Sequence, residues 1–252
     1  MIIGIDEVGR GALAGPLAVG AVSLGEVQLE GLTDSKKLTP KKRLAFDRLI
    51  RQSSAQAALG WVSAADIDKL GISRSLRLAI LRALKQLEVG PDDQIILDGT
   101  VNFLKDTEYS GQVTTMKQAD LLVPSVSAAS VIAKVARDNY MKLVDPLFTG
   151  YGLSRHVGYG TAVHLSAIAE RGPTPLHRMS FAPLGSRPAA ARPPAEPSGG
   201  QRAETAAADY LSLNKFKVLD RNWKTRWCEI DIVARSGDKV WLVEVKYRSS
   251  DR

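Results

Sequence analysis

The stretch IIGIDEVGRG, residues 2–11, decides how the fold is interpreted. Its first four residues form an apolar run, which predicts a buried strand over Ile2–Ile5. Asp6 and Glu7 follow at once, and a glycine-rich segment comes next. Taken alone, this pattern is typical of an acidic turn between two strands, because glycine and acidic residues are common in turns.

The same pattern recurs further along the chain. Gln94–Leu97 predicts another buried strand, and Asp98 and a glycine follow it. Because the carboxyl ends of neighbouring parallel strands meet at one edge of a sheet, we expect Asp6, Glu7 and Asp98 to converge. Asp120 is a fourth candidate, with a solvated surface acid as the alternative interpretation.

Clustered carboxylates are typical of sites for hard divalent cations such as Mg²⁺ and Mn²⁺. Two such ions about 4 Å apart can activate a water and stabilise the leaving oxygen in phosphodiester hydrolysis. The acids therefore suggest a metal-dependent reaction on a phosphodiester.

Strands and helices alternate through the first two thirds of the chain. Further strands are predicted over Leu17–Leu24, Ala55–Val62 and Val113–Met116, and helices over Pro40–Arg51, Leu76–Leu87 and Ser127–Leu143. Thr39 is the expected N-cap of the first helix, and Ser73 or Ser75 that of the second. This alternation predicts an α/β fold.

Composition limits which binding partners, disulfides and metal sites the chain could have. The 252 residues carry a net charge of +7 and give a pI of about 9.5, which favours a polyanionic partner such as nucleic acid. Cys228 is the one cysteine, so an intramolecular disulfide and cysteine-cluster metal sites are excluded. We expect His156, His164 and His177 to be structural hydrogen-bonding residues, because Mg²⁺ prefers oxygen ligands.

No apolar run approaches the roughly 18 residues that a membrane helix needs. The first residues lack the basic stretch of a signal peptide, so we expect a cytoplasmic protein without a membrane partner. Residues 185–200, GSRPAAARPPAEPSGG, hold no aliphatic side chain larger than alanine and no aromatic one, which predicts a linker. It would separate a domain over residues 1–184 from a smaller one over residues 201–252.

Six blocks of the first domain, taken in order, resemble the ribonuclease HII family. They are DEVGRG at 6–11 with AGP at 14–16, TDSKKL at 33–38, LDG at 97–99, SAASVIAKVARD at 127–138, GYGT at 158–161 with His164 after it, and HRMSF at 177–181. The resemblance implies an RNase H-like mixed sheet with flanking helices. It also implies an endonuclease that cuts RNA paired with DNA, or ribonucleotides embedded in duplex DNA.

The resemblance assigns roles to the acids. It makes Asp6, Glu7, Asp98 and Asp120 the metal-binding and catalytic residues, with Mn²⁺ or Mg²⁺ as the cofactor and two ions present when substrate is bound. Gln118-Ala119 stands before Asp120 where many relatives have a glycine. Cleavage would fall on the 5′ side of a ribonucleotide and leave 3′-OH and 5′-phosphate ends.

The resemblance also assigns the substrate contacts. Gly9, Arg10 and Gly11 would bring backbone groups close to the 2′-OH that distinguishes RNA from DNA. Tyr159 would pack on the sugar at the RNA–DNA junction, its alternative being a loop anchor. Lys36 and Lys134 lie in matched blocks and are the better candidates for phosphate contacts. Other basic residues that could follow phosphates, or simply face solvent, are Lys37, Lys41, Lys42, Arg43 and Arg137.

The tail has a pattern of its own. A helix is predicted over Ala206–Leu213, and a hairpin is predicted from strands at 229–234 and 240–246 around residues 236–238. Its polar positions resemble those of the YraN-like family, whose core is similar to restriction-endonuclease-type nucleases: Glu204, Asp231, Glu244 and Lys246. By this resemblance they form a tentative second site, although polar faces of amphipathic strands give the same pattern.

The tail departs from that family in three ways. Ala203 and Cys228 stand where glycines are usual, and the chain stops before the family's remaining helix and strand. We therefore expect a small, partial α/β restriction-endonuclease-like domain.

Two other interpretations stay open at this stage. A non-catalytic nucleic-acid-binding module could retain the fold, although carboxylates clustered beside a polyanion weaken binding unless a metal neutralises them. A nuclease of the RNase H fold could instead act on DNA alone, and the Gly9–Gly11 segment and Tyr159 argue against it. The resemblance favours a monomeric ribonuclease acting on RNA–DNA hybrids or on DNA with embedded ribonucleotides.

Overall fold

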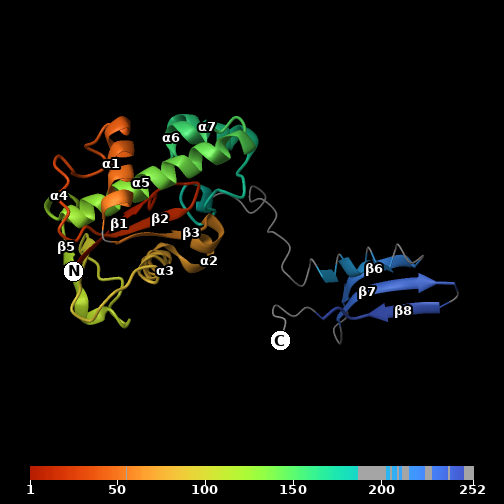
Figure 1. The fold of residues 1–252 in the computed structure, drawn as a ribbon. Helices are drawn as coiled ribbons and strands as arrows, with labels where there is room; N and C mark the ends of the chain where they lie inside the picture. Colours follow the sequence, from red (N-terminus) through yellow and green to blue (C-terminus); the bar gives the residue numbers. More distant parts are fainter. Residues whose placement is uncertain are drawn as a thin grey trace. The chain divides into compact units, whose positions relative to one another are not determined.

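The computed structural model describes residues 1–54, 56–186, 203–204, 206–208, 210–211, 216–224, 229–237 and 239–246 (Figure 1). The chain divides into two compact units, Met1–Pro193 and Pro194–Arg252. Most of the predicted linker, from residue 187 onward, lies outside the described residues.

The described part of the first unit is built on one mixed sheet. Its strands are β1 (Ile2–Val8), β2 (Leu17–Ser23), β3 (Gln56–Val62), β4 (Gln94–Asp98) and β5 (Val113–Met116). They lie in the order β3-β2-β1-β4-β5. The β1–β2 and β2–β3 pairs are antiparallel, whereas β1–β4 and β4–β5 are parallel. The predicted α/β fold with a mixed sheet is confirmed.

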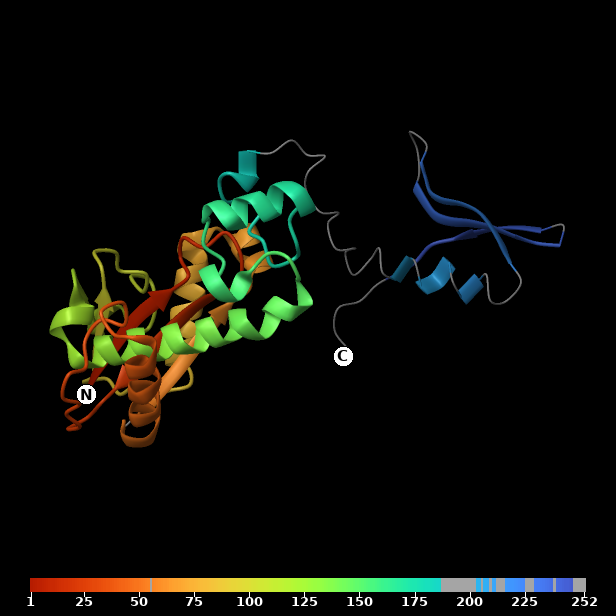
Figure 2. The same ribbon diagram turned by 90° about the horizontal axis from the view of Figure 1, so that it is seen from above.

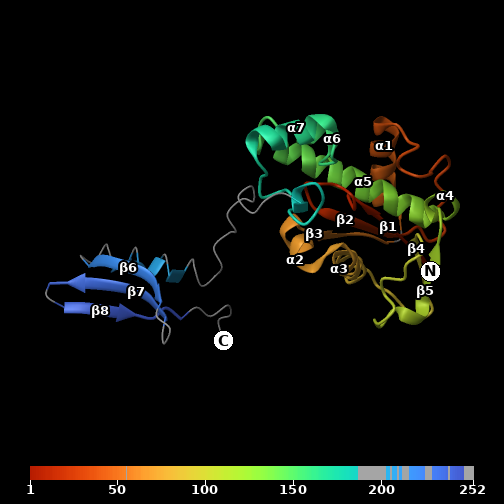
Figure 3. The same ribbon diagram turned by 180° about the vertical axis from the view of Figure 1, so that it is seen from behind.

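Helices cover both faces of this sheet. They are α1 (Pro40–Ser53), α2 (Ala64–Leu70), α3 (Ile72–Leu84), α4 (Ala119–Leu122), α5 (Pro124–Val144), α6 (Leu153–His156) and α7 (Ala162–Arg171), with short 3-10 turns at Ser110–Gln112, Asp145–Leu147 and Leu184–Ser186. Figures 1 and 3 show α1 and α5 on one face and α3 on the other. Seen from above, α6 and α7 lie near the C-terminal end of α5 (Figure 2).

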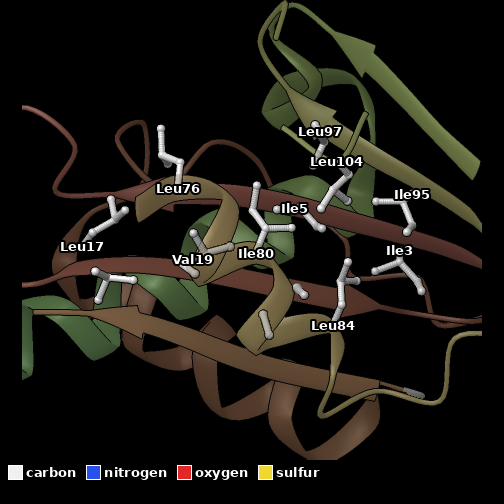
Figure 4. Close-up of a cluster of buried hydrophobic side chains, with 14 of the residues drawn as sticks. Ile3, Ile5, Leu17, Val19, Leu76, Ile80, Leu84, Ile95, Leu97 and Leu104 are labelled. Atoms are coloured by element: carbon white, nitrogen blue, oxygen red, sulfur yellow. The ribbon is translucent and has the colours of Figure 1, made fainter. Parts of the chain in front are cut away.

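Alternation along β1 fixes which side chains face which helix. Ile3 and Ile5 enter a buried cluster with Ile80 and Leu84 of α3 (Figure 4). Burial of each such side chain contributes about 1.5–3 kcal/mol. Asp6 lies one residue further on, so it points to the opposite face, where α5 packs on the sheet. The hydrophobic pattern of one strand thus aims Asp6 at α5.

Several element boundaries differ from those predicted. β1 continues to Val8 because its antiparallel pairing with β2 runs as far as Val8↔Ala18, so Asp6 and Glu7 lie inside the strand end. The expected caps of α3 are wrong: Gly71 is the N-cap, and Ser75 lies within the helix, where its hydroxyl donates to the Gly71 carbonyl (2.8 Å).

The other predicted elements correspond to observed ones. The remaining strands of the first unit agree with the predictions to within one residue at each end, apart from Ala55, which lies outside the described residues. Thr39 caps α1 as expected, accepting from the backbone N–H of Lys42 (3.3 Å). α2 was not predicted, although Ser63 caps it in the usual way by accepting from the backbone N–H of Asp66 (3.1 Å).

The second unit contains a sheet in the order β6-β7-β8, from β6 (Lys217–Lys224), β7 (Glu229–Ser236) and β8 (Lys239–Val243). Both pairs are antiparallel, which confirms the predicted hairpin. Ala208, Ile232 and Ala234 form its buried cluster. β8 ends at Val243, before Glu244, so the predicted second strand was three residues too long. Leu213 and Cys228 lie outside the described residues.

Within the described ranges, no helix combines the length and the apolar character that crossing a bilayer requires.

Candidate active site

Asp6 and Asp98 stand at the ends of two adjacent parallel strands. The register of β1 and β4 runs to Ile5↔Leu97, so the next residue on each strand is an aspartate. Equal register places the two side chains on the same face of the sheet. The register therefore brings two of the predicted acids, Asp6 and Asp98, to one edge of the sheet.

The third and fourth acids reach the same edge by different routes. Glu7 follows Asp6 on β1 and is partly exposed. A carboxylate oxygen of Asp98 accepts a hydrogen bond from the backbone N–H of Ala119 (2.8 Å), which fixes the start of α4. Gln118 takes a left-handed conformation (φ 57°) just before it, and Asp120 is buried in the first turn. Asp98 thus fastens the segment that carries Asp120.

Burial, more than the neighbouring charges, changes the ionisation of these acids. Burial, with smaller contributions from Glu7 and Asp98, raises the pKa of Asp6 to about 7. Burial and the charge of Asp98 also raise the pKa of Glu7 and of Asp120. Like charges in a poorly hydrated place disfavour ionisation, and a bound cation would reverse this effect.

The donor set suits a hard divalent cation, since every candidate ligand is a carboxylate oxygen. Across the ranges that the structure describes, no three acidic, histidine or cysteine side chains are already grouped so that they could hold a metal ion. The chemistry of the donors fits the implied ions.

Two buried arginines hold the Gly9–Pro16 segment in place by donating hydrogen bonds to its backbone carbonyls. The guanidinium of Arg137, on α5, donates to the carbonyls of Pro16 (2.8 Å) and Ala14 (3.1 Å). That of Arg178 donates to the carbonyls of Arg10 (2.9 Å) and Gly15 (2.9 Å). Neither side chain has measurable solvent exposure. The shape of the glycine-rich turn is therefore set by residues far away in sequence.

The loop carrying Tyr159 is bonded to this same segment. The carbonyl of Gly158 accepts from the backbone N–H groups of Leu13 (2.8 Å) and Ala14 (3.1 Å). Tyr159 is 39% exposed, and the guanidinium carbon of Arg137 lies 5.8 Å from its ring centroid. Tyr159 shares one pocket with Asp6, Glu7, Val8, Gly9, Arg10, Gly11, Ser35, Lys36, Ser130 and Lys134.

Lys36 lines the same pocket as Asp6 and Glu7. Burial lowers the pKa of Lys36, but attraction to Asp34, Asp6 and Asp120 outweighs it and leaves the pKa raised. Its backbone N–H donates to Asp34 (2.9 Å), and Ser35 accepts from the hydroxyl of Ser130 on α5 (2.8 Å). The loop thus holds a cation close to the carboxylates.

The predicted phosphate contacts divide into three groups. Lys134 lines the pocket and pairs with Asp138 (2.9 Å). Lys37, Lys41 and Lys42 are exposed on the surface. The last group is Arg43 and Arg137: for the buried Arg137 a direct phosphate contact was the wrong expectation, and for Arg43 it stays a prediction. Arg43 donates to the carbonyls of Ser35 (2.7 Å) and Leu38 (3.1 Å), and Arg137 is buried.

Sequence reasoning missed Asp34, Ser130 and Arg178 as parts of this site. Ser130 is buried on α5, and its hydroxyl lowers the pKa of Asp6 against the larger effect of burial. A signal for it existed, because Ser127 and Ser130 interrupt an otherwise apolar helix. No local signal marks Arg178 as buried, since a basic residue is usually solvated.

Contacts near the end of β8 connect three of the four residues predicted for a second site. The carboxylate of Asp231 accepts from the backbone N–H of Val245 (2.6 Å), which brings β7 next to Glu244. Lys246 pairs with Glu244 at 3.7 Å, and both side chains are more than three-quarters exposed. Glu204 lies in a helical stretch, and no described contact links it to the other three.

Comparisons with known proteins follow the two units. Residues 3–184 match the family described as Ribonuclease HII. Residues 203–252 match the family described as Uncharacterised protein family UPF0102. Ribonuclease HII of Prochlorococcus marinus (strain MIT 9313) is 45% identical over 185 residues, covering 71% of this chain and 83% of the relative. Ribonuclease HII of Coxiella burnetii (strain Dugway 5J108-111) is 43% identical, covering 73% and 89%.

Solved structures give the same result for the fold. Ribonuclease H2 from Pyrococcus horikoshii OT3 superposes with a TM-score of 0.62 at 24% identity, covering 73% of this chain and 95% of that one. RNase HII in the PCNA:RNase HII complex from Archaeoglobus fulgidus gives a TM-score of 0.59 at 28% identity, covering 72% and 95%. Bst-RNase HIII, solved in complex with Mn²⁺, gives 0.56 at 21% identity, covering 73% and 68%.

Proposed function

The chain belongs to the ribonuclease HII family of nucleases, and from this premise we propose how its own residues act. It cleaves RNA in RNA–DNA hybrids as an endonuclease. We propose that it also cuts duplex DNA holding embedded ribonucleotides, and that it hydrolyses the phosphodiester on the 5′ side of a ribonucleotide. The products would carry 3′-OH and 5′-phosphate ends.

One observation carries this proposal. Asp6 and Asp98 follow the last paired residues of two adjacent strands, and Asp6 and Glu7 line one pocket together with the Gly9–Gly11 turn and Tyr159. Acids and sugar-reading groups are thus adjacent. A site built this way can select a ribose while it hydrolyses the neighbouring phosphodiester.

We propose that Asp6, Glu7, Asp98 and Asp120 hold two Mn²⁺ or Mg²⁺ ions when substrate is bound. Such ions supply an activated water and charge stabilisation for the departing 3′ oxygen. The Mn²⁺ complex of Bst-RNase HIII supports this cofactor class for a protein of the same fold. The carboxylates would hold the cations near the strand ends, with Asp6 in its ionised form.

Selection of the ribose is proposed to come from backbone groups. The turn at Gly9 has a φ of 88°, and it is fastened from below by Arg137 and Arg178. A rigid glycine-containing turn that lines the pocket can bring backbone groups within hydrogen-bonding reach of a 2′-OH that DNA lacks. Lys36 and Lys134 would attract the phosphates on either side.

We further propose the arrangement of the whole chain. A ribonuclease domain spans residues 1–184, a linker spans residues 185–200, and a partial YraN-like domain spans residues 201–252. The protein would act as a monomer in the cytoplasm. Of the acids in the tentative second site, Glu244 is exposed and Asp231 is partly buried, and we propose that neither takes part in this reaction.

The test uses the full-length protein and two labelled duplexes. One duplex is DNA with a single ribonucleotide, and the other is the same sequence made only of DNA. With Mg²⁺ or Mn²⁺, we expect one cut on the 5′ side of the ribonucleotide and an intact control. Cleavage of both duplexes would favour a nuclease acting on DNA, and binding without cleavage would favour a non-catalytic module.

A further inference from the structure

All three histidines of the chain lie in contact with one another next to Tyr159. The ring of His156 stacks on that of His164, with centroids 4.2 Å apart. Nε2 of His164 and Nε2 of His177 lie 3.1 Å apart. His164 is fully buried and His177 is 2% exposed. As predicted, these residues make hydrogen bonds within the fold.

The backbone groups bonded to His177 and His164 determine which ring nitrogen of each histidine carries the proton. The backbone N–H of Thr174 can only donate, and it donates to Nδ1 of His177 (2.8 Å). A neutral His177 must then carry its proton on Nε2. The carbonyl of Tyr159 can only accept, and it lies 2.9 Å from Nδ1 of His164, which must carry the proton there.

These two assignments agree with each other. Nε2 of His177 has a proton to give, and Nε2 of His164 has a free lone pair, so one hydrogen bond joins them. A directed chain therefore runs from the Thr174 amide through both rings to the Tyr159 carbonyl. Burial lowers the pKa of both histidines, to about 4 for His177, which keeps the chain neutral.

The backbone around Tyr159 needs such an external support. Gly158 and Gly160 flank Tyr159 and leave the conformation on both sides weakly determined. The Tyr159 carbonyl accepts from His164 and from the Thr161 amide (2.9 Å), while the Tyr159 N–H donates to the His156 carbonyl (2.9 Å). The direction of the ring depends on these bonds.

We propose that His164, held in its Nδ1–H form by His177, is a positioning residue that sets the Tyr159 ring against the substrate sugar. This inference rests on the proposed role of Tyr159 in sugar contact. A histidine that served stability alone would affect folding and leave the turnover of folded enzyme unchanged. A positioning residue lowers turnover, because small misplacements of a contacting group are costly.

A matched pair of variants separates the two roles. In His164→Asn the side-chain amide takes the place of Nδ1 and can still donate to the Tyr159 carbonyl. In His164→Gln the amide takes the place of Nε2 and reaches only His177. Both variants lose the stack on His156, so their stability losses should be similar.

The measurements are kcat and KM on the single-ribonucleotide duplex, duplex affinity without divalent metal, and thermal unfolding. We expect His164→Gln to lose about 10- to 100-fold in kcat with little change in duplex affinity. His164→Asn should retain most of the wild-type kcat. Equal turnover by the two variants, or a poorer His164→Asn, would overturn the proposal.

If substitutions at His164 prevent folding, variants of His177 test the same proposal. His177→Gln keeps a donor toward His164, whereas His177→Asn keeps only the acceptor for the Thr174 amide. We expect lower kcat from His177→Asn than from His177→Gln, and the reverse order would contradict the chain.

Tyr159→Ala distinguishes failure of the inference from failure of the function. If Tyr159→Ala loses turnover and His164→Gln does not, the histidine chain has no positioning role and the proposed function stands. If Tyr159→Ala is fully active on the same duplex, the role of Tyr159 is wrong and the inference falls with it. If the wild type leaves that duplex uncut, the proposed function itself fails.

Discussion

The backbone of Gly9 lies directly on the guanidinium of Arg137. A Cβ built on Gly9 would be 2.1 Å from Nε of Arg137, which is closer than any side chain tolerates. Arg137 is itself held by three backbone carbonyls and makes none of the described ion pairs. The turn beside the acids therefore rests on a buried cation that has little freedom to move.

Gly9→Ala should destabilise the protein. The added methyl would collide with Arg137, and the φ of 88° is unfavourable for alanine. We expect a loss of about 2–4 kcal/mol in unfolding free energy, from strain together with overpacking. Gly11→Ala is the control, because a Cβ there meets nothing within 4 Å. Chemical denaturation that gave equal stabilities for the two variants would contradict this packing.

His177 should make stability fall in acid. Its pKa is lowered from 6.5 to about 4 in the folded protein, first by burial and then by His164. Between these values the unfolded chain binds a proton that the folded one does not, so stability is complete above pH 6.5 and declines toward pH 4. The advantage of wild type over His177→Gln should shrink by about 3 kcal/mol across that window. A pH-independent difference would show that His177 stays freely titratable.

In metal-free protein, Asp6 should make stability increase as the pH falls, which is the opposite of the effect of His177. Its folded pKa of about 7 lies above the ordinary 3.8, so the folded state keeps a proton that the unfolded state loses in between. At neutral pH this costs stability, and the cost disappears toward pH 4. Asp6→Asn should therefore be more stable than wild type by up to about 4 kcal/mol at pH 7. Thermal melts in chelator at pH 4 and pH 7 would measure it, and Mg²⁺ should reduce the difference.

Removal of the tail should leave ribonucleotide-directed cleavage intact. The variant should end at Ser186 because Leu184 is buried in the first unit and the Gly185 amide donates to the Phe181 carbonyl (2.8 Å). Residues 202–252 carry 11 basic against 8 acidic residues, so the tail should add weak affinity that salt removes.

The comparison is full-length against shortened protein on one duplex at two salt concentrations. Glu244→Ala in the full-length protein should cut at the wild-type rate. Loss of cleavage on shortening at both salts would show that the tail completes the active unit.

Sequence patterns predicted the acidic edge of the sheet because its cause is local. Apolar runs that end in Asp6 and Asp98 carry both the strand assignment and the position of the acid. The start of α3 was misjudged because Gly71, in a left-handed region, replaces the expected serine cap. A propensity argument favours serine, and only the packed turn reveals the glycine.

Arg137 and Arg178 mark the limit of what the sequence could reveal. Basic residues in a basic protein are expected at the surface, and nothing local distinguishes these two. Their burial is stabilised by carbonyls of residues 10, 14, 15, 16 and 157, which come together only in the folded chain. The histidine chain behind Tyr159 was hidden for the same reason.

The most direct measurement is single-turnover cleavage of the single-ribonucleotide duplex by Asp98→Asn across a Mg²⁺ or Mn²⁺ titration. Asparagine keeps an oxygen to accept from the Ala119 amide, so the fold and the start of α4 should be preserved. We predict more than about 100-fold loss of cleavage, since groups that merely orient metal ligands already cost 10- to 100-fold. Duplex affinity at low metal should persist or increase. Near-normal cleavage by a folded Asp98→Asn at matched metal concentrations would contradict the assignment of the acids.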